Sequence, residues 1–511
     1  MSDLFLIGVD IGTTICKAAI FSRSGKQIAL AYREYPLIKI SGKKIEQDAE
    51  VWWTLVKETI KECVNKLTNS ERKSIKAISI SAQGISFVPI DNKGIPISNA
   101  ITWLDSRAEE EAKILVETFG MDAIYKKTGI QANPFYILPK IMWLKKNRPD
   151  IYNKTYRFCT CLDFLTFRFA GKFIIDYSIA GGSLLHDVQK LDWSEELLEM
   201  AELTRDKLPE LDWAGSVIGP ILEEVAEVLG IPKETDIVLG GHDQECAGIG
   251  AGLQAGEITI SLGTASILLV CIDKPLFDKK MRIPCLPSVE RDRWVMEAVV
   301  NVGGAGLKWV CELINEFSKT LSCKAIKIPL LNYKRVSEIA KTIGNGAGGI
   351  FFYPHMSGAT SPYWISSAKG VFHGISLSTT MAHLLRAVLE GWVFQIKTNL
   401  LTLKELTYDP EEVIVFGGGA RDPFMLQLTA DILGKPVIIL NTIETALLGA
   451  CILAAVGSGI YDDIVSAQNV MVKRTGYIEP IKKNTKEYSK IYKRYLKIEK
   501  AILRIDSTES K

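Results

Sequence analysis

Apolar residues at the start of the chain come in short runs separated by tight turns, a pattern typical of β-strands. The segments LFLIGVD, CKAAIFS and QIALAYREYP predict three strands joined by IGTT and SGK. Apolar residues at helical spacing then run through AEVWWTLVKETIKECVNKL, with Asp48 as the expected N-cap. IKAISISAQG predicts another buried strand. This alternation of strands and helices predicts an α/β domain built in layers.

The same pattern returns about 250 residues later, as an internal duplication would require. GEITISLGTASILLVCIDKP again reads as a strand, a Gly-Thr turn and a strand. VIVFGGGARDPFMLQLTADILGKPVII follows as a strand, a glycine turn, a helix and a strand, and ETALLGACILAAVGSG as a helix with small residues. We therefore expect two related halves that face each other across a cleft, with their boundary near residues 247–256.

Composition and charge narrow the class of protein. A chain of 511 residues is too long for one compact core, and 47% hydrophobic with 23% charged residues is an ordinary globular balance. The net charge of +2 gives no reason to expect nucleic acid or a membrane surface as partner. The ten cysteines follow no metal or redox spacing, and neither a signal peptide nor a membrane span is expected. We expect a cytoplasmic protein with free thiols, and a homodimer is left open.

The Gly-Thr turns suggest phosphate binding, because glycine lets backbone N–H groups approach an anion and threonine adds a hydroxyl donor. Either turn alone is equally compatible with a purely structural hairpin. Two such turns, together with GGG between a strand and a helix, favour a clamp for a polyphosphate. Asp10, at the end of the first strand, is either a turn-forming residue or a ligand for the Mg²⁺ that accompanies a nucleotide.

One carboxylate stands in the glycine-rich stretch VLGGHDQECAGIGAG, directly after an apolar strand. Asp243 is placed there to accept a proton from a substrate hydroxyl, which could then attack a phosphoryl group. Gln244 could hydrogen-bond a polyol, whereas His242 need only shape the loop. The alternative for Asp243 is a helix cap for the segment that follows.

These motifs together resemble the FGGY family of carbohydrate kinases, over residues 4–477. The resemblance implies two ribonuclease-H-like domains of the actin-like ATPase superfamily and the phosphorylation of a sugar or polyol hydroxyl with ATP and Mg²⁺. It implies that Asp243 is the catalytic base and that Asp10 serves the metal. It further assigns to the nucleotide the residues Asp10, Gly12, Thr13, Thr14, Lys17, Gly263, Thr264, Gly304, Lys308, Gly418 and Asp422.

The sugar side departs from better-known members of that family. Glycerol kinases have Arg-Glu after the equivalent of Gln83, and xylulose kinases have Met-His, whereas this chain has Gly84 and Ile85. We expect the missing side chain at Gly84 to leave room for a sugar larger than glycerol. The remaining candidates for sugar binding are Gln83, Trp103, Asp105, Arg107 and Gln244. The alternative for WLDSR is a core tryptophan beside a structural Asp–Arg ion pair.

The expected domains are residues 1–250, with the sugar site, first phosphate loop and base, and residues 251–480, with the second phosphate loop and the adenosine site. Residues 481–511 are expected to form a charged helical tail. The favoured function is a kinase for a ketose, a pentulose such as xylulose. A kinase for another polyol, hexulose or sugar acid is the first alternative. An actin-like or Hsp70-like ATPase without a sugar substrate, or a non-catalytic sugar-binding regulator, are alternatives of other classes.

Overall fold

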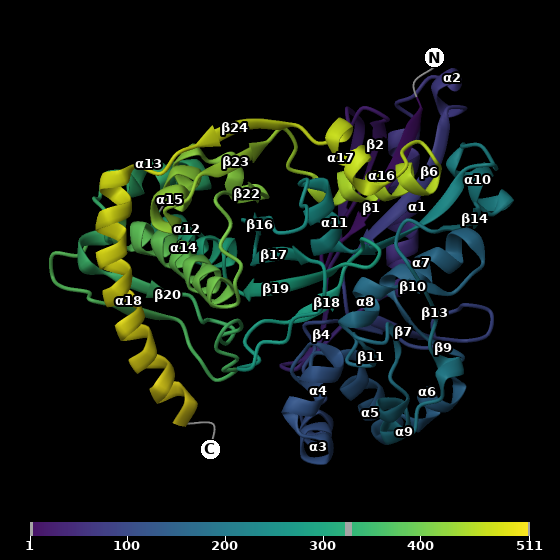
Figure 1. Cartoon of the computed structure of the whole chain (residues 1–511), viewed down its shortest axis with the longest axis horizontal. Helices are drawn as coiled ribbons and strands as arrows, with labels where there is room; N and C mark the ends of the chain where they lie inside the picture. The colour runs from purple at the N-terminus through teal and green to yellow at the C-terminus, as the bar shows by residue number, and fades with distance from the viewer. Residues whose placement is uncertain (1–3, 322–329, 509–511) are drawn as a thin grey trace. The chain divides into compact units, whose positions relative to one another are not determined.

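The computed structural model describes residues 4–321 and 330–508, which form two compact units (Figure 1). The first unit consists of Met1–Ala255, Cys271–Met296 and Glu444–Lys473, and the second of Gly256–Val270, Glu297–Ile443 and Arg474–Lys511. Each unit is therefore assembled from segments that lie far apart in the sequence. The chain first passes from one unit to the other after Ala255.

The first unit is built on a six-stranded sheet with the order β14-β15-β6-β1-β2-β3. Strand β1 is antiparallel to β2 and parallel to β6, and β6 is parallel to β15. The carboxyl ends of β1, β6 and β15 therefore meet at one edge of the sheet. The bounds of the six strands are Phe5–Ile11 (β1), Ile15–Ser22 (β2), Gln27–Glu34 (β3), Ile75–Ala82 (β6), Val217–Pro220 (β14) and Asp236–His242 (β15).

The interior strands of this sheet are apolar on both faces because helices cover both. Helix α1 (Ala49–Val64) begins after the predicted N-cap Asp48, which accepts a hydrogen bond from Glu50 N–H. Helix α16 (Thr445–Gly457) packs on β1, β6 and β15 and is buried along most of its length. Its Gly449 allows close approach to α11 (Asp243–Gly250), since a Cβ there would lie 1.8 Å from the carbonyl oxygen of Cys246.

A second sheet of the first unit has the order β4-β5-β8-β7-β9. Its strands are Ile38–Ser41 (β4), Lys44–Gln47 (β5), Phe87–Ile90 (β7), Ala100–Ile101 (β8) and Arg157–Thr160 (β9). The other helices of this unit include α2 (Asn69–Arg72), α3 (Glu109–Phe119), α4 (Met121–Thr128), α5 (Ile137–Asn147), α6 (Pro149–Lys154), α7 (Cys161–Ala170), α8 (Tyr177–Gly181), α9 (Glu195–Ala201), α10 (Glu223–Leu229) and α17 (Ile464–Met471). Short strands complete it: β10 (Ile174–Asp176), β11 (His186–Asp187), β12 (Asp192–Trp193), β13 (Glu210–Asp212) and β18 (Cys285–Pro287).

The second unit repeats the same plan. Strands β16 and β17 form an antiparallel hairpin, and β16 is parallel to β22, which is parallel to β23. Strand β24 closes the sheet antiparallel to β23. This repetition confirms the predicted α/β fold with two related halves. The strands are Ile258–Ser261 (β16), Ser266–Ile272 (β17), Trp294–Val300 (β19), Val413–Phe416 (β22), Val437–Leu440 (β23) and Arg474–Ile478 (β24), with the short pair Phe351–Tyr353 (β20) and Val371–His373 (β21).

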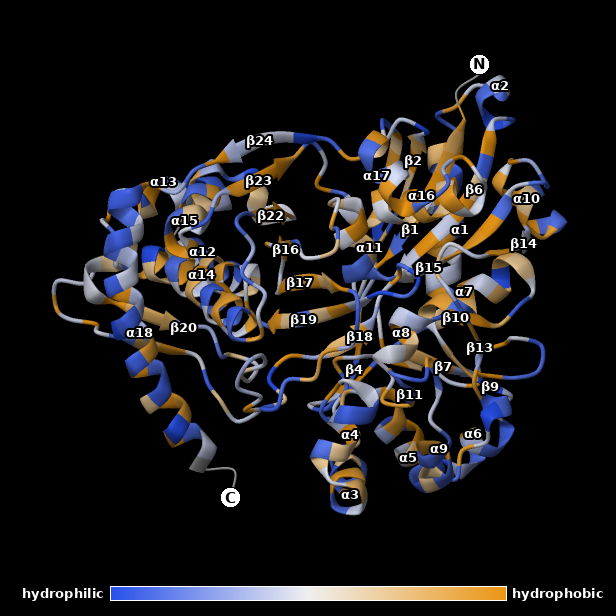
Figure 2. Cartoon of the chain, viewed as in Figure 1, coloured by the Kyte–Doolittle hydropathy of each residue, from blue (hydrophilic) through white to orange (hydrophobic). Residues whose placement is uncertain are grey.

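Helices α12 (Gly304–Leu321), α13 (Tyr333–Ala340), α14 (Met381–Glu405), α15 (Pro423–Leu433) and α18 (Lys482–Thr508) belong to the second unit. Figure 2 shows that α18 alternates between hydrophilic and hydrophobic residues, as an amphipathic helix does. The charged segment expected to be helical at residues 481–511 contains α18, and one face of this helix is part of the unit's core. That face carries the buried side chains of Tyr488, Tyr492, Tyr495, Glu499 and Leu503.

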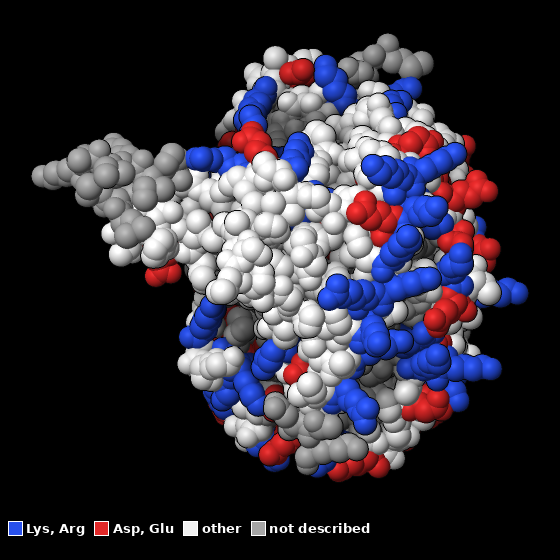
Figure 3. Space-filling model, turned by 90° about the vertical axis from the view of Figure 1, so that its left-hand side faces the viewer, with Lys and Arg blue, Asp and Glu red and all other residues white. Residues whose placement is uncertain are grey.

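A polar network fixes α18 in place. Tyr488 Oη donates to Glu390 Oε1 at 2.8 Å, and Tyr363 Oη donates to Glu499 Oε2 at 2.7 Å. Glu499 Oε1 also accepts a hydrogen bond from Gln395 Nε2 and lies 3.2 Å from His355 Nε2. The opposite face of the helix is solvated, and Figure 3 shows Lys and Arg gathered along that side of the unit. This face contains the exposed Lys486, Lys490, Lys493, Lys497, Lys500 and Arg504.

Two expectations from composition can be compared directly with the structure. Within residues 4–321 and 330–508, no helix combines the length and the apolar character needed to cross a membrane. The nine cysteines of the described segments are buried and form no disulfide, which confirms the expected free thiols.

Candidate active site

The carboxyl edge of the first unit's sheet brings two predicted carboxylates together. In the strand register, Asp10 on β1 lies opposite Ser81 on β6, and His242 at the end of β15 lies opposite Ala82. Ser81 Oγ donates to Asp10 Oδ1 at 2.8 Å. Asp243 follows His242 as the first residue of α11, so it is not the helix cap that the alternative required. The parallel arrangement thus places Asp10 and Asp243 at the same end of the sheet.

Burial perturbs both carboxyl groups. Desolvation, aided by the negative charge of Asp243, raises the pKa of Asp10 to about 7, although Lys17 and Ser81 act in the opposite direction. Desolvation also raises the pKa of Asp243 to about 6, against the hydrogen bond from Gln244 N–H. The Asp243 side chain nevertheless keeps 24% of its surface exposed, so a substrate hydroxyl can reach it. A carboxylate of raised pKa in an accessible position suits a general base.

Lys17 lies beside this pair of carboxylates. It is opposite Asp10 in the β1–β2 register, and its Nζ lies 2.6 Å from Glu444 Oε2. Glu444 is the residue that precedes α16. Glu444 is the functional candidate that the sequence analysis missed, because no local pattern links it to a lysine 427 residues earlier.

The first Gly-Thr turn is held by a backbone hydrogen bond and by the side chains of Tyr35 and Trp103. Gly12 N–H donates to Ile15 O at 3.0 Å, which closes the turn, and Tyr35 Oη donates to Gly12 O. Trp103 Nε1 donates to Thr13 Oγ at 2.8 Å. Trp103 is 37% exposed, so it is not the core residue that the alternative supposed. The structure therefore joins a predicted sugar residue directly to a predicted phosphate residue, while Thr14 is exposed.

Gln83 lies at the same edge but in a buried hydrogen-bond network. Its backbone N–H donates to Ile11 O at 2.8 Å, and its side-chain Nε2 donates to Gln47 Oε1 at 3.0 Å. Ser86 Oγ donates to Gln83 Oε1 at 3.2 Å. Gln47 in turn donates to Thr13 O. This network links the first turn to the segment 83–86.

Asp105 and Arg107 form a buried ion pair. Asp105 is fully buried, and its oxygens accept hydrogen bonds from Arg107 Nε, Arg107 Nη2 and Ile45 N–H at 2.7–3.0 Å. Arg107 Nη2 also lies 2.7 Å from Glu46 Oε1, and its guanidinium stacks 5.0 Å from the Trp143 ring. This geometry matches the structural ion pair that the sequence analysis kept as the alternative. Both residues then support the loop that carries Trp103.

The space expected beside Gly84 is occupied. A Cβ at Gly84 would lie 2.7 Å from both Cδ2 and Nε2 of the His242 imidazole. The next side chain, Ile85, packs against Gly182, where a Cβ would lie 2.9 Å from Ile85 Cγ2. The expectation of empty volume at Gly84 was wrong, because a side chain from β15 fills it.

In the second unit, three predicted nucleotide segments converge. The carbonyl oxygens of Gly263 and Thr264 accept hydrogen bonds from the backbone N–H groups of residues 303–305, at the start of α12. Leu262 O accepts one from Gly419 N–H at 2.8 Å. Gly304 allows this approach, since a Cβ there would lie 2.8 Å from Gly263 O. The second Gly-Thr turn, Gly304 and the GGG segment thus form one glycine-lined surface.

The other residues expected to contact the nucleotide lie around this surface. A Cβ at Gly418 would meet no atom within 4 Å, so the backbone there is open. Asp422 is the N-cap of α15 and accepts a hydrogen bond from Phe424 N–H at 3.0 Å and another from Ser337 Oγ. Lys308 is exposed and lies 3.7 Å from Glu312. Asp422 therefore caps α15, whereas the sequence predicted a contact with the nucleotide for it.

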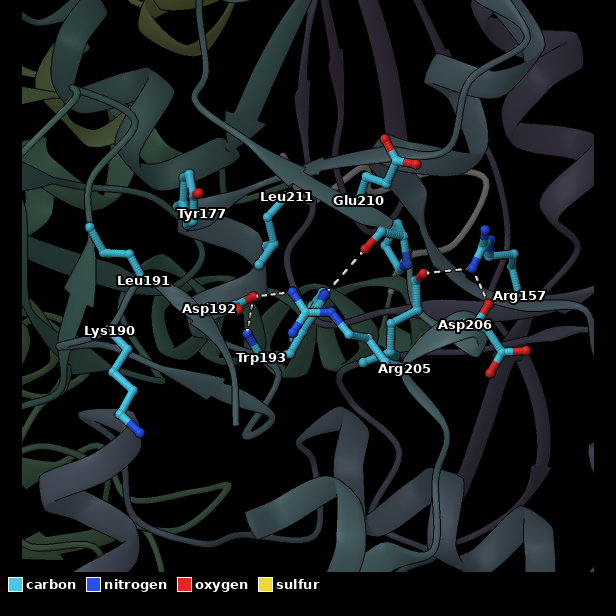
Figure 4. Close-up of a pocket in the computed structure, with 12 residues that line it drawn as sticks. Arg157, Tyr177, Lys190, Leu191, Asp192, Trp193, Arg205, Asp206, Glu210 and Leu211 are labelled. Atoms are coloured by element: carbon cyan, nitrogen blue, oxygen red, sulfur yellow. Dashed lines mark hydrogen bonds and ion pairs between the residues drawn. The ribbon is translucent and has the colours of Figure 1, made fainter. Parts of the chain in front are cut away.

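A separate hollow of about 780 Å³ lies on the first unit (Figure 4). Arg205 spans it and pairs with Asp192, while Arg157 donates to the carbonyl oxygens of Asp206 and Leu208. None of the residues predicted for catalysis or nucleotide binding lines this hollow. The hollow is therefore not part of the candidate active site.

The sequence matches two family domains in the same order as these units. Residues 5–250 match the N-terminal domain of the FGGY family of carbohydrate kinases, and residues 258–458 match the C-terminal domain. The chain belongs to the FGGY family of carbohydrate kinases. It is therefore a carbohydrate kinase, and the family expected from its motifs is confirmed.

Individual relatives carry different substrate names. A gluconokinase of Bacillus subtilis (strain 168) is 31% identical over 95% of this chain and 93% of the relative. A xylulose kinase of the same organism is 28% identical over 97% of this chain and 96% of the relative. The crystal structure of ligand-bound xylulose kinase from Lactobacillus acidophilus superposes with a TM-score of 0.89 at 25% identity, covering 98% of each chain. The activity class is thus shared by these relatives, but the sugar is not.

Proposed function

We propose that this FGGY kinase transfers the γ-phosphoryl group of ATP to a hydroxyl of a ketose, a pentulose such as xylulose. The observation that carries the proposal is the position of Asp243, an accessible carboxylate of raised pKa at the edge of the sheet that also holds Asp10. Proton acceptance by such a base frees the substrate oxygen for attack on phosphorus.

Each neighbouring group has a role in this reaction. Asp243 takes the proton of the substrate hydroxyl, and Gln244 holds its carboxylate through the backbone N–H. Lys17 and the first turn, with Gly12, Thr13 and Thr14, approach the transferred phosphoryl group. Trp103, held by Thr13, offers its indole face to the carbon side of the sugar. Gln83 contributes by fixing the first turn through Gln47.

The residues fit a Mg-ATP complex. Asp10 has a raised pKa because desolvation and the nearby Asp243 disfavour its charged form, which a divalent cation would stabilise. The described residues contain no cluster of three or more His, Cys, Asp or Glu side chains arranged to hold a metal. That fits Mg²⁺, which is usually held by one or two carboxylates with phosphate oxygens and water. Mg²⁺ would supply charge neutralisation at the phosphates, with Asp10 as its protein ligand.

The adenosine side of the nucleotide is proposed for the second unit. Gly263, Thr264 and Gly304 form the backbone surface for phosphates, and Gly418 leaves room beside the GGG segment. Lys308 is exposed and can reach an anion, and Asp422 holds the start of α15. Support comes from the convergence of these segments around one turn.

A sugar acid such as gluconate is the second candidate, because a gluconokinase is 31% identical to this chain. The ketose is favoured by the charges near Asp243. Arg107 already forms ion pairs with Asp105 and Glu46. The buried Lys140 donates hydrogen bonds to the carbonyl oxygens of Thr102 and Phe135. A sugar carboxylate would therefore meet Asp10 and Asp243 without either of these cations as a partner.

The test is a coupled assay of ADP release with xylulose, other ketopentoses, gluconate, glycerol and no sugar. We expect kcat/KM to be highest for a ketopentose, at least about tenfold above glycerol, a gap of about 1.4 kcal/mol. If gluconate gives the highest kcat/KM, the substrate is a sugar acid and the proposed ketose is wrong. Turnover that is independent of any sugar would overturn the kinase proposal in favour of a plain ATPase.

A further inference from the structure

The junction between β15 and α11, where the proposed base lies, is held by a hydrogen bond to α8, which is itself hydrogen-bonded to the residue before it. His242 N–H donates to Ser178 Oγ at 2.9 Å, and Ser178 donates through both its N–H and its Oγ to the buried Asp176. On the same strand, Gly241 leaves no room for a side chain, because its Cβ would lie 2.3 Å from Val289 Cγ1. The backbone before Asp243 is therefore held by contacts within the first unit.

The His242 imidazole continues this support on the side of the site. Its Nε2 lies 3.3 Å from Asp243 Oδ1, and the ring fills the place where a Cβ of residue 84 would stand. A carboxylate oxygen only accepts hydrogen bonds, so Nε2 must carry the proton when the two groups bond. The ring is thus wedged between Gly84 and the carboxylate.

We propose that His242 is a positioning residue, whose imidazole occupies the space left by Gly84 and orients the Asp243 carboxylate toward the sugar hydroxyl. The proposal rests on the function proposed above for Asp243. It also explains why residue 84 is glycine, whereas glycerol kinases and xylulose kinases have a larger side chain there. Residue 84 is glycine because any Cβ there would displace the ring, and not because the sugar needs the volume.

Glycine at residue 84 and histidine at residue 242 then form a matched pair, which a double-mutant cycle can measure. Gly84→Ala pushes the ring away from Asp243, so we expect kcat to fall about tenfold while the KM for ATP stays within about twofold. His242→Ala removes the same support and should lower kcat by a similar factor. In the double variant the new methyl enters the vacated space, so Gly84→Ala should cost less than about twofold there.

Two further readouts separate positioning from a general loss of structure. His242→Asn retains an N–H donor without the ring, so we expect it to restore part of the kcat lost in His242→Ala. The acid limb of the kcat/KM profile should move to higher pH in His242→Ala, because the Asp243 carboxylate loses a donor. Other ionisable groups near Asp243 are Asp10 on β1, Cys161 on α7 and Cys246 on α11, with Lys17 and Glu444 near Asp10, and they remain unchanged.

The stability of the same variants tests the pair without any assay of activity. Gly84→Ala should lower Tm in the native background and much less in the His242→Ala background. Gly42→Ala is the matched control, since a Cβ at Gly42 meets no atom within 4 Å. Additive effects of the two substitutions on both kcat and Tm would overturn the proposal. If the native protein turns over no sugar, the proposed function fails, whereas coupled Tm effects would still establish the Gly84–His242 pair.

Discussion

The Lys17 ammonium lies 2.6 Å from the Glu444 carboxylate, so the cation expected to meet phosphate is already paired. Both side chains are partly enclosed, with 29% and 15% of their surfaces exposed. Glu444 is also the residue at which the chain returns to the first unit from the second. A nucleotide phosphate that binds Lys17 must therefore compete with this carboxylate.

Glu444→Gln is predicted to strengthen nucleotide binding. Loss of the negative charge releases Lys17 and reduces repulsion of the phosphates, so the Kd for Mg-ATP should fall about threefold to tenfold, with the sugar KM unchanged. Titration calorimetry measures the change. Glu62→Gln, which removes a surface partner of Arg33, is the control and should have no effect. Weaker nucleotide binding in Glu444→Gln would mean that Glu444 positions Lys17 for phosphate instead of competing for it.

Asp243→Asn is predicted to abolish most turnover. The amide keeps the shape of the side chain but cannot accept the proton, and the contribution of a general base is roughly 10²–10⁴-fold in kcat. Binding of ATP should persist, which calorimetry can verify on the same preparation. Asp150→Asn, at an exposed position of α6, serves as the control. Turnover within about twofold of native in Asp243→Asn would exclude Asp243 as the base.

Thr264→Val is predicted to weaken the binding of ATP much more than the binding of sugar. The change removes an exposed hydroxyl from the second turn but leaves the backbone bonds to residues 303 and 305 intact. A lost hydrogen bond to a charged phosphate should cost about 1.5–3 kcal/mol of binding. Separate KM values for sugar and ATP measure the difference. An equal loss of affinity for both substrates would point to a disturbed fold rather than a lost contact.

Asp10→Asn is predicted to stabilise the ligand-free protein at alkaline pH. The folded pKa of Asp10 is raised from 3.8 to about 7, so the folded state binds more protons than the unfolded state between these values. The contribution of Asp10 to stability is therefore present at low pH and is lost as pH rises through about 7. The variant should have a higher Tm than native at pH 8, and the gap should close toward pH 4. Asp48→Asn, at the exposed cap of α1, controls for loss of a carboxylate elsewhere. A lower Tm for Asp10→Asn than for the native protein at pH 8 would contradict the predicted destabilisation by the ionised Asp10.

Local signals in the sequence were sufficient for the elements that carry the site. The β1–β2 hairpin and the Asp48 cap depend on residues adjacent in sequence, so their pattern reveals them. Asp243 was found because a charge after an apolar strand is unusual. The family motifs then supplied the order of the two halves, which no single segment contains.

The contacts that the sequence did not reveal are all between distant segments. Glu46 closes the Asp105–Arg107 pair from 61 residues away in sequence, and His242 fills the space at Gly84 from another strand. Neither partner has a spacing that would indicate the contact. The buried face of α18 did have a signal, because Tyr488, Tyr492, Tyr495 and Glu499 recur at helical spacing among the lysines. The high charge of the segment concealed that signal.

The interleaving of the two units also constrains how this protein is made. The first unit needs α16 against β1 and β6, and residues 445–457 leave the ribosome long after those strands. The second unit needs α18, which is translated later still. Neither sheet can complete its core while most of the chain is being synthesised. The strands β1, β6 and β16 therefore keep apolar surface exposed until α16 and α18 have been made. Successful production should therefore depend on chaperone capacity and on the rate of synthesis more than it would for two domains arranged one after the other.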